Sequence, residues 1–205
     1  MGTKVSVAAS LLIVALIAMA GALSDRKNID LKSAIEFGIP ATIGTFIGAK
    51  VGLLLSDQTQ MLIFGTVMLL TLYFMVRNPN LDNRFKDIPF IFVMESLLVG
   101  IITGIVGVGG GFLIVPVLHL SKKLSMKKAI ATSLVIIAIK SLVGFMGYAG
   151  SINLDYYFIG LYILIGAIGV VVAKNIKDKI PEENIKKVFN ALLFLVSIVV
   201  ILNNI

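Results

Sequence analysis

Long apolar stretches alternate with short polar segments along the whole chain. A helix that crosses a bilayer needs about 20 mostly apolar residues, because it must cover about 30 Å of hydrocarbon at about 1.5 Å per residue. Six stretches have this character, and a seventh is too long for one crossing. The pattern predicts an all-α, polytopic transmembrane helical bundle. The single spans are residues 5–24, 33–55, 58–76, 129–148, 156–173 and 188–205, and the long stretch is residues 88–120.

The long apolar stretch, residues 88–120, contains a cluster of glycines. Gly107, Gly109, Gly110 and Gly111 fall within five positions, and each glycine costs a helix about 1 kcal/mol relative to alanine. Backbone N–H groups that a break sets free find no partner in lipid, so the protein itself must satisfy them. We therefore predict a broken, re-entrant glycine-rich hairpin. Close packing between helices is the alternative use of small residues in a membrane.

The composition agrees with a membrane protein. Hydrophobic residues make up 58% of the chain and charged residues 14%, and the mean hydropathy is +1.02. A soluble domain has about 45–50% apolar residues and about 25% charged residues. With no cysteine and one histidine, His119, the sequence excludes a disulfide-stapled domain and a zinc module. We expect no metal and no cofactor.

The positive charges indicate how the chain is threaded. Cytoplasmic loops carry an excess of Lys and Arg. If the long stretch enters and leaves the membrane on one side, that side holds 15 of the 18 basic residues and the other side two. If the stretch crosses the membrane once, one side holds 6 basic residues and the other 11. The fold-back is favoured, and the net charge of +7 is explained without a nucleic-acid partner. The segments predicted to face the cytoplasm from the cell membrane are residues 25–32, 77–87, 121–128 and 174–187.

An internal repeat relates the first three spans to the last three, with an offset of 129 and then 125 residues. Residues 25–32 contain three basic residues and their counterpart, residues 150–155, contains none, so the copies are predicted to cross in opposite directions as inverted repeats. The division is a first repeat at 1–76, a linker at 77–87 and a second repeat at 88–205. Matched positions are Thr3 with Thr132, Ala20-Gly21 with Ala149-Gly150, residues 28–30 with 153–155, Gly44 with Gly169, and Phe64 with Phe189.

The first span has a second interpretation. Lys4, the apolar run after it and the small residues Ala18 and Ala20 also fit a cleavable secretory signal. The internal repeat favours a membrane span.

The glycine cluster and the helix after it resemble a known family. The sequence GIVGVGGGFLIVPVL, followed beyond a basic loop by Ala131-Thr132-Ser133, is similar to the TauE/SafE family of membrane permeases, often called sulfite exporters. The resemblance covers essentially the whole chain. It implies two copies of a hairpin plus three spans, whereas this chain starts in register with Ile130 and its first copy lacks the glycine hairpin. Either the start lies upstream or the first repeat is truncated.

The resemblance also implies where a substrate binds. Backbone N–H groups at the start of a helix and hydroxyl groups replace the water around an oxyanion. A hydroxyl at a helix start also serves as an N-cap, which is the structural alternative. The residues on the family's motif positions are Gly107, Gly109, Gly110, Gly111, Thr132 and Ser133, with Thr3 and Lys4 as first-repeat counterparts.

Two ionisable residues, Lys140 and Glu95, lie within predicted spans and off the motif. Such residues are costly in a membrane and usually face the bundle interior or a wet cavity. We expect Lys140 to attract the anion, and Glu95 to pair with it or to carry a proton for coupling. A structural pair or a snorkelling lysine is the alternative.

Together these features predict a permease that exports a small anion, such as sulfite, a sulfonate or a related sulfur oxyanion, by alternating access. The partners are this anion and the lipid bilayer, and no enzyme activity is expected. Two alternatives stay open: a non-transporting structural or assembly protein, derived from a truncated permease, and an anion channel. The sequence leaves the oligomeric state undefined.

Overall fold

The structure, a computed structural model, is all-helical in the part of the chain that it describes. Its eight α-helices confirm the predicted fold class. The helices are α1 (Thr3–Ser24), α2 (Leu31–Gly52), α3 (Asp57–Arg77), α4 (Pro89–Val106), α5 (Gly111–Leu120), α6 (Met126–Met146), α7 (Tyr156–Lys177) and α8 (Glu182–Leu202), with a short 3₁₀ turn, η1, at Arg26–Asn28. The described residues are 3–52, 54–77, 89–106, 111–146, 156–177 and 179–202.

Each predicted span corresponds to one helix, and five of the described helices, α2, α3, α6, α7 and α8, are long and apolar enough to cross a membrane. Two helices, α6 and α8, begin three or more residues before their apolar stretches. α6 begins at Met126 and α8 at Glu182, because charged residues extend the first turns beyond the apolar part. In α8 the extension includes an ion pair of 2.9 Å between Glu183 and Lys187, one helical turn apart.

In the long apolar stretch the structure describes two helices. α4 ends at Val106 and α5 begins at Gly111. Gly107, Gly109 and Gly110 fall between these ends, outside the described residues. The predicted break at the glycines therefore stays a prediction.

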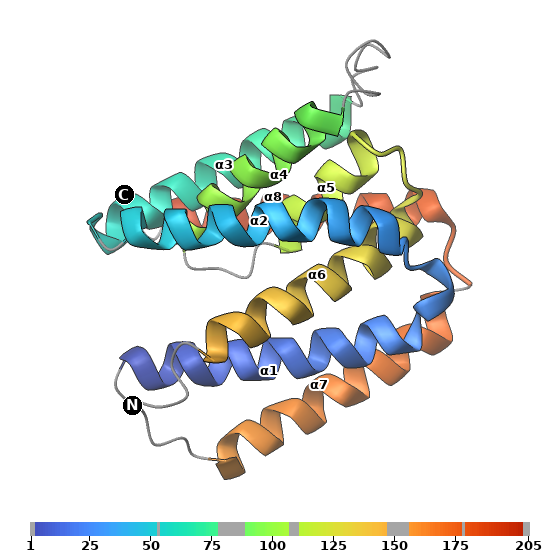
Figure 1. The fold of residues 1–205 in the computed structure, drawn as a ribbon. Helices are drawn as coiled ribbons and strands as arrows, with labels where there is room; N and C mark the ends of the chain where they lie inside the picture. Colours follow the sequence, from blue (N-terminus) through green and yellow to red (C-terminus); the bar gives the residue numbers. More distant parts are fainter. Residues whose placement is uncertain are drawn as a thin grey trace.

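The helices form two groups that meet at α6 (Figure 1). On one side α1 lies beside α6 and α7 packs on α1, while α2, α3, α4, α5 and α8 form the other group. Within the second group α2 packs on α4 and α3 packs on α8, and both α2 and α5 also contact α6. α6 is therefore the helix that joins the two groups.

The closest packing joins α2 and α4, whose small residues let the two backbones touch. A side chain at Gly44 or Gly48 of α2, or at Gly100 or Gly104 of α4, would overlap the backbone of the facing helix. The contacts advance in the same direction along both helices, so α2 and α4 run parallel. Along the pair, Gly44 faces Leu97, Gly48 faces Ile101 and Gly52 faces Ile105.

The end of α5 lies at the same end of the bundle as the start of α4. Lys122, two residues beyond α5, donates a 2.6 Å hydrogen bond to Glu36 near the start of α2. The same ammonium lies 4.1 Å from the ring centroid of Phe92 near the start of α4. α4 therefore leads away from this end, and α5 leads back to it.

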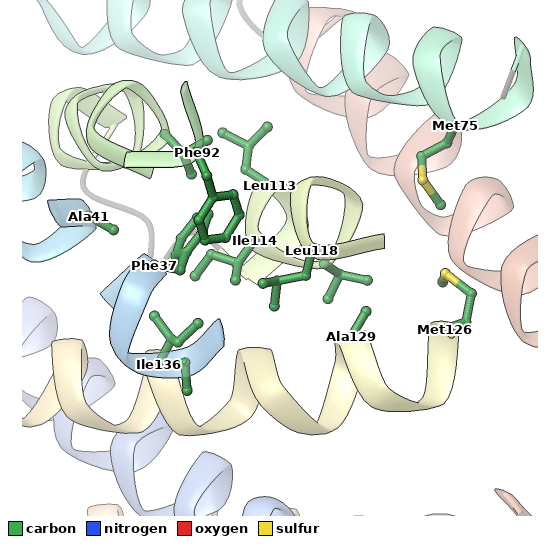
Figure 2. Close-up of a cluster of buried hydrophobic side chains, with 13 residues drawn as sticks. Phe37, Ala41, Met75, Phe92, Leu113, Ile114, Leu118, Met126, Ala129 and Ile136 are labelled. Carbon is green, nitrogen blue, oxygen red and sulfur yellow. The ribbon is translucent and has the colours of Figure 1, made fainter. Parts of the chain in front are cut away.

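α5 lies at the centre of the largest apolar core. Its residues Ile114 and Leu118 are fully buried, and they pack among Phe37 of α2, Phe92 of α4 and Ile136 of α6 (Figure 2). The rings of Phe37 and Phe92 lie with centroids 5.8 Å apart. This core fixes α5, and with it the position of Gly111, against three helices.

Candidate functional site

Lys140 of α6 lies inside the bundle, with 9% of its surface exposed. Its Nζ donates a 3.2 Å hydrogen bond to Oγ1 of Thr103 on α4. Thr103 is itself buried and donates a 3.0 Å bond to the carbonyl of Gly100. Among the described residues no carboxylate forms an ion pair with Lys140. In the described part of the bundle, the partner of this ammonium is therefore a neutral hydroxyl.

Lys140 lies near the end of α4 and the start of α5. Thr103, its partner, is three residues before the end of α4. Gly111, the first residue of α5, packs on Ile137, because a methyl group added there would lie 2.8 Å from Cδ1 of Ile137. Ile137 and Lys140 are three residues apart and share a face of α6. The structure thus brings together three features: the buried ammonium, the end of α4 and the start of α5.

The first turn of α5 supplies the chemistry of an anion site. The first N–H groups of a helix have no partner within the helix, and the helix dipole places partial positive charge there. An ammonium has three N–H donors, and that of Lys140 uses one on Thr103. Together these groups suit an oxyanion. Gly107, Gly109 and Gly110, which were predicted to contribute backbone N–H groups, lie outside the described residues.

Thr132 and Ser133 lie about two turns away from Lys140 along α6, and both hydroxyls hold the structure together. Thr132 is fully buried, and its Oγ1 accepts a 3.0 Å hydrogen bond from the N–H of Asp30, directly before α2. Ser133 donates a 2.8 Å bond to the carbonyl of Ile130. The structure therefore does not bring these two residues into the cluster at Lys140. Their role in substrate binding stays a prediction.

Thr3 and Lys4 lie in the first turn of α1. Their side chains fall outside the part of the chain that the structure describes. Their predicted role as first-repeat counterparts stays a prediction.

Glu95 lies on α4, eight residues and about 12 Å before Thr103. Its Oε2 is buried and has no hydrogen-bond partner. No ion pair joins Glu95 to Lys140 within the described ranges, so the pairing considered from the sequence is absent and Thr103 takes its place. The predicted role of Glu95 as a proton carrier stays a prediction.

Sequence reasoning missed Thr103 of this cluster and a second buried hydroxyl on α6, that of Ser141. Ser141 follows Lys140, is 1% exposed, and its Oγ has no hydrogen-bond partner. The signal for Thr103 was a hydroxyl in an apolar helix just before the glycines. Its side chain joins Lys140 only because α4 and α6 meet in space, and no spacing along the chain encodes that contact.

Polar contacts at the basic end of the bundle tie the helices together. Glu36 accepts from Lys122, and Lys32 lies 3.9 Å from the same carboxylate. The N–H at the start of α6, on Met126, donates to the carboxylate of Glu182 at the start of α8. His119 makes a 2.8 Å hydrogen bond to the carbonyl of Leu124. In the described residues no three His, Cys, Asp or Glu lie close enough to hold a metal ion.

These features define the class of the protein: a polytopic helical membrane protein with a charged group held inside its bundle. A family model described as sulfite exporter TauE/SafE matches residues 1–200. The chain belongs to this family of membrane transporters, which confirms the resemblance seen in the sequence.

Relatives that match this chain are named as transporters. A probable membrane transporter protein of Xylella fastidiosa is 28% identical over 181 residues, which cover 83% of this chain and 68% of the relative. A probable membrane transporter protein of Bacillus subtilis is 26% identical over 216 residues, which cover 94% of this chain and 79% of the relative. A probable membrane transporter protein of Methanocaldococcus jannaschii is 26% identical over 165 residues, which cover 77% of this chain and 61% of the relative. No solved structure matches the chain significantly.

Proposed function

We propose that this protein exports a small anion across the cell membrane, with sulfite, a sulfonate or a related sulfur oxyanion as its substrate. The observation that carries the proposal is the buried ammonium of Lys140 beside the start of α5, whose one partner among the described residues is the hydroxyl of Thr103. A buried charge is stable only when it is paired and hydrogen-bonded. A bound anion would supply the missing negative charge.

In this proposal each group of the cluster has one task. Lys140 attracts the anion and donates hydrogen bonds to its oxygens, and the N–H groups at the start of α5 donate from the other side. Thr103 holds the ammonium in place by accepting one of its protons. Glu95, with its buried oxygen, takes up and releases the proton that couples transport to a pH gradient.

We further propose that residues 1–76 and 88–205 are inverted repeats, that the basic segments face the cytoplasm, and that transport proceeds by alternating access. In two of the three equivalent pairs the helices have equal lengths: α2 and α7 have 22 residues each, and α3 and α8 have 21. Contacts between α1 and α7 correspond to contacts between α6 and α2. The start of α4 and the end of α5 share one end of the bundle, which supports a re-entrant hairpin.

The test is anion flux in proteoliposomes with sulfite, a sulfonate and chloride, with and without a pH gradient. We expect saturable flux of a sulfur oxyanion that depends on the gradient. Lys140→Met is expected to lower this flux at least tenfold, because it removes the charge that faces the substrate. The matched control is Lys50→Met on α2, since Lys50 is exposed and lies 4.9 Å from the ring centroid of Phe46.

Other outcomes would overturn the proposal. Flux that Lys140→Met leaves unchanged would remove Lys140 from the site. The absence of flux for every anion would favour a structural or assembly protein. Unsaturable flux that ignores the pH gradient would favour an anion channel.

A further inference from the structure

A groove with a volume of about 390 Å³ opens between α1, α6 and α7, at the end of the bundle where the basic segments lie. Ile17 and Gly21 of α1, Leu134 of α6, and Val170 and Ala173 of α7 line it. These residues present aliphatic carbon to the groove. Ile17 lies seven residues before Ser24, so the groove extends about 10 Å along α1 from its end.

Two lysines stand at the rim of this groove. Lys127 is half-buried in the first turn of α6, and Lys174 is exposed near the end of α7. Neither forms an ion pair within the described residues. Asp25 is the one acidic side chain among the lining residues, and it accepts a 2.6 Å hydrogen bond from Asn28. The rim is therefore positive on balance.

A second groove shows that the lysines are specific to the first. It lies between α2 and α6, has a volume of about 370 Å³, and is lined by aliphatic residues, glycine and one threonine, Thr42. No charged side chain lines it. Of these two grooves of similar size, the first combines an apolar wall with a cationic rim and the second does not.

We propose that the first groove binds an anionic phospholipid, with one acyl chain along the apolar wall and the phosphate between Lys127 and Lys174. The apolar wall suits the acyl chain, which lies in the bilayer core, and the ammonium groups at its end suit the phosphate, which lies at the bilayer surface. Basic pockets between membrane helices at the cytoplasmic side bind anionic head groups in this way. The site is independent of the proposed anion site, since none of its lining residues belongs to the cluster at Lys140.

The test measures lipid binding to the full chain in detergent. Phosphatidylglycerol and phosphatidylcholine with the same acyl chains are titrated, and both the thermal unfolding temperature and the bound lipid by native mass spectrometry are recorded. We expect phosphatidylglycerol to bind about tenfold more tightly than phosphatidylcholine, because each surface lysine contributes attraction to an anionic head group. Inorganic phosphate is expected to have no effect, since it lacks the acyl chain.

Two pairs of variants locate the site. Lys127→Gln with Lys174→Gln is expected to abolish the preference for phosphatidylglycerol, while Lys128→Gln with Lys179→Gln, which removes two lysines that do not line the groove, keeps it. Ala173→Phe fills the apolar wall and is expected to weaken binding of both lipids, while Val172→Phe, an exposed neighbour outside the groove, leaves binding unchanged. The second pair keeps the test decisive if the lysine variants fold poorly.

Three results would overturn the proposal. Equal binding of the two phospholipids would show that the rim does not read the head group. An equal effect of both lysine pairs would assign the preference to overall charge. A response to inorganic phosphate that matches phosphatidylglycerol would make the rim a site for free anions.

Discussion

α2 and α7 are counterparts in the internal repeat, yet their surroundings differ. In α2, 28% of the span is buried, and Gly44 lies directly against the backbone of α4. In α7, 6% of the span is buried, and a methyl group added at Gly169, the counterpart of Gly44, would meet nothing within 4 Å. The difference arises from α4, which covers α2 and has no equivalent over α7 among the described helices.

This comparison shows that a glycine in a membrane helix does not by itself indicate a packing contact. Glycine allows two helices to approach, but it stabilises nothing unless a second helix uses the space. The same residue type is a packing site in α2 and part of an open surface in α7. Substitutions on the two helices should therefore differ widely in effect.

The largest effect is expected for Gly48→Leu in α2. The new side chain would overlap the backbone of Ile101, and neither helix can yield without opening the core around Phe37 and Phe92. We expect a loss of more than about 4 kcal/mol in the free energy of unfolding, measured by unfolding in a titration with dodecyl sulfate. A loss below about 1 kcal/mol would contradict the parallel packing of α2 on α4.

The next effect concerns the hydrogen bond between Thr103 of α4 and Lys140 of α6. Thr103→Val removes the acceptor for Lys140 and leaves a buried ammonium without its partner. We expect a loss of about 1–3 kcal/mol in the same titration, together with lower anion flux. Thr71→Val is the control, because the buried hydroxyl of Thr71 donates only to the carbonyl of Val67 in its own helix. Equal losses for both variants would remove Thr103 from the site.

A smaller effect is expected for Glu36→Gln. This carboxylate ties the start of α2 to Lys122 at 2.6 Å, whereas its counterpart in α7 is Leu161, which is exposed. The ion pair is partly open to solvent, so we expect a loss of about 0.5 kcal/mol that fades at high salt. A loss that does not depend on salt would indicate that Glu36 acts through packing instead of charge.

The smallest effect is expected for Gly169→Leu in α7. The added side chain enters open space, so the free energy of unfolding should change by less than about 0.5 kcal/mol. The same measurement as for Gly48→Leu gives a direct comparison of the two helices. A large loss would show that another helix covers this face of α7 in the membrane.

The residue ranges of the helices could be predicted from the sequence, but which helices pack against each other could not. Apolar stretches of membrane-spanning length determine where each helix lies, and the glycines at 107–111 predict where α4 and α5 separate. The parallel contact of α2 with α4 depends on which surfaces meet after folding. The glycines in α2 indicate a close approach without naming the helix that makes it.

The candidate site was predicted only in part, for a similar reason. The cost of a charge in lipid singles out Lys140 from the sequence alone, and the structure buries it. Its partner is Thr103 and not Glu95, because the turns of α4 carry Glu95 about 12 Å away along the helix. Thr132 shows the opposite case, since one hydroxyl oxygen suits both a ligand and a helix cap, and here it accepts from Asp30.

Two polar contacts hold α6 at different heights. Near one end Thr132 accepts from the backbone before α2, and about two turns further on Lys140 donates to α4. Because these two hydrogen bonds lie at different heights, α6 cannot rotate about its long axis without breaking one of them. A movement that keeps both bonds therefore carries α6 together with the start of α2 and with α4.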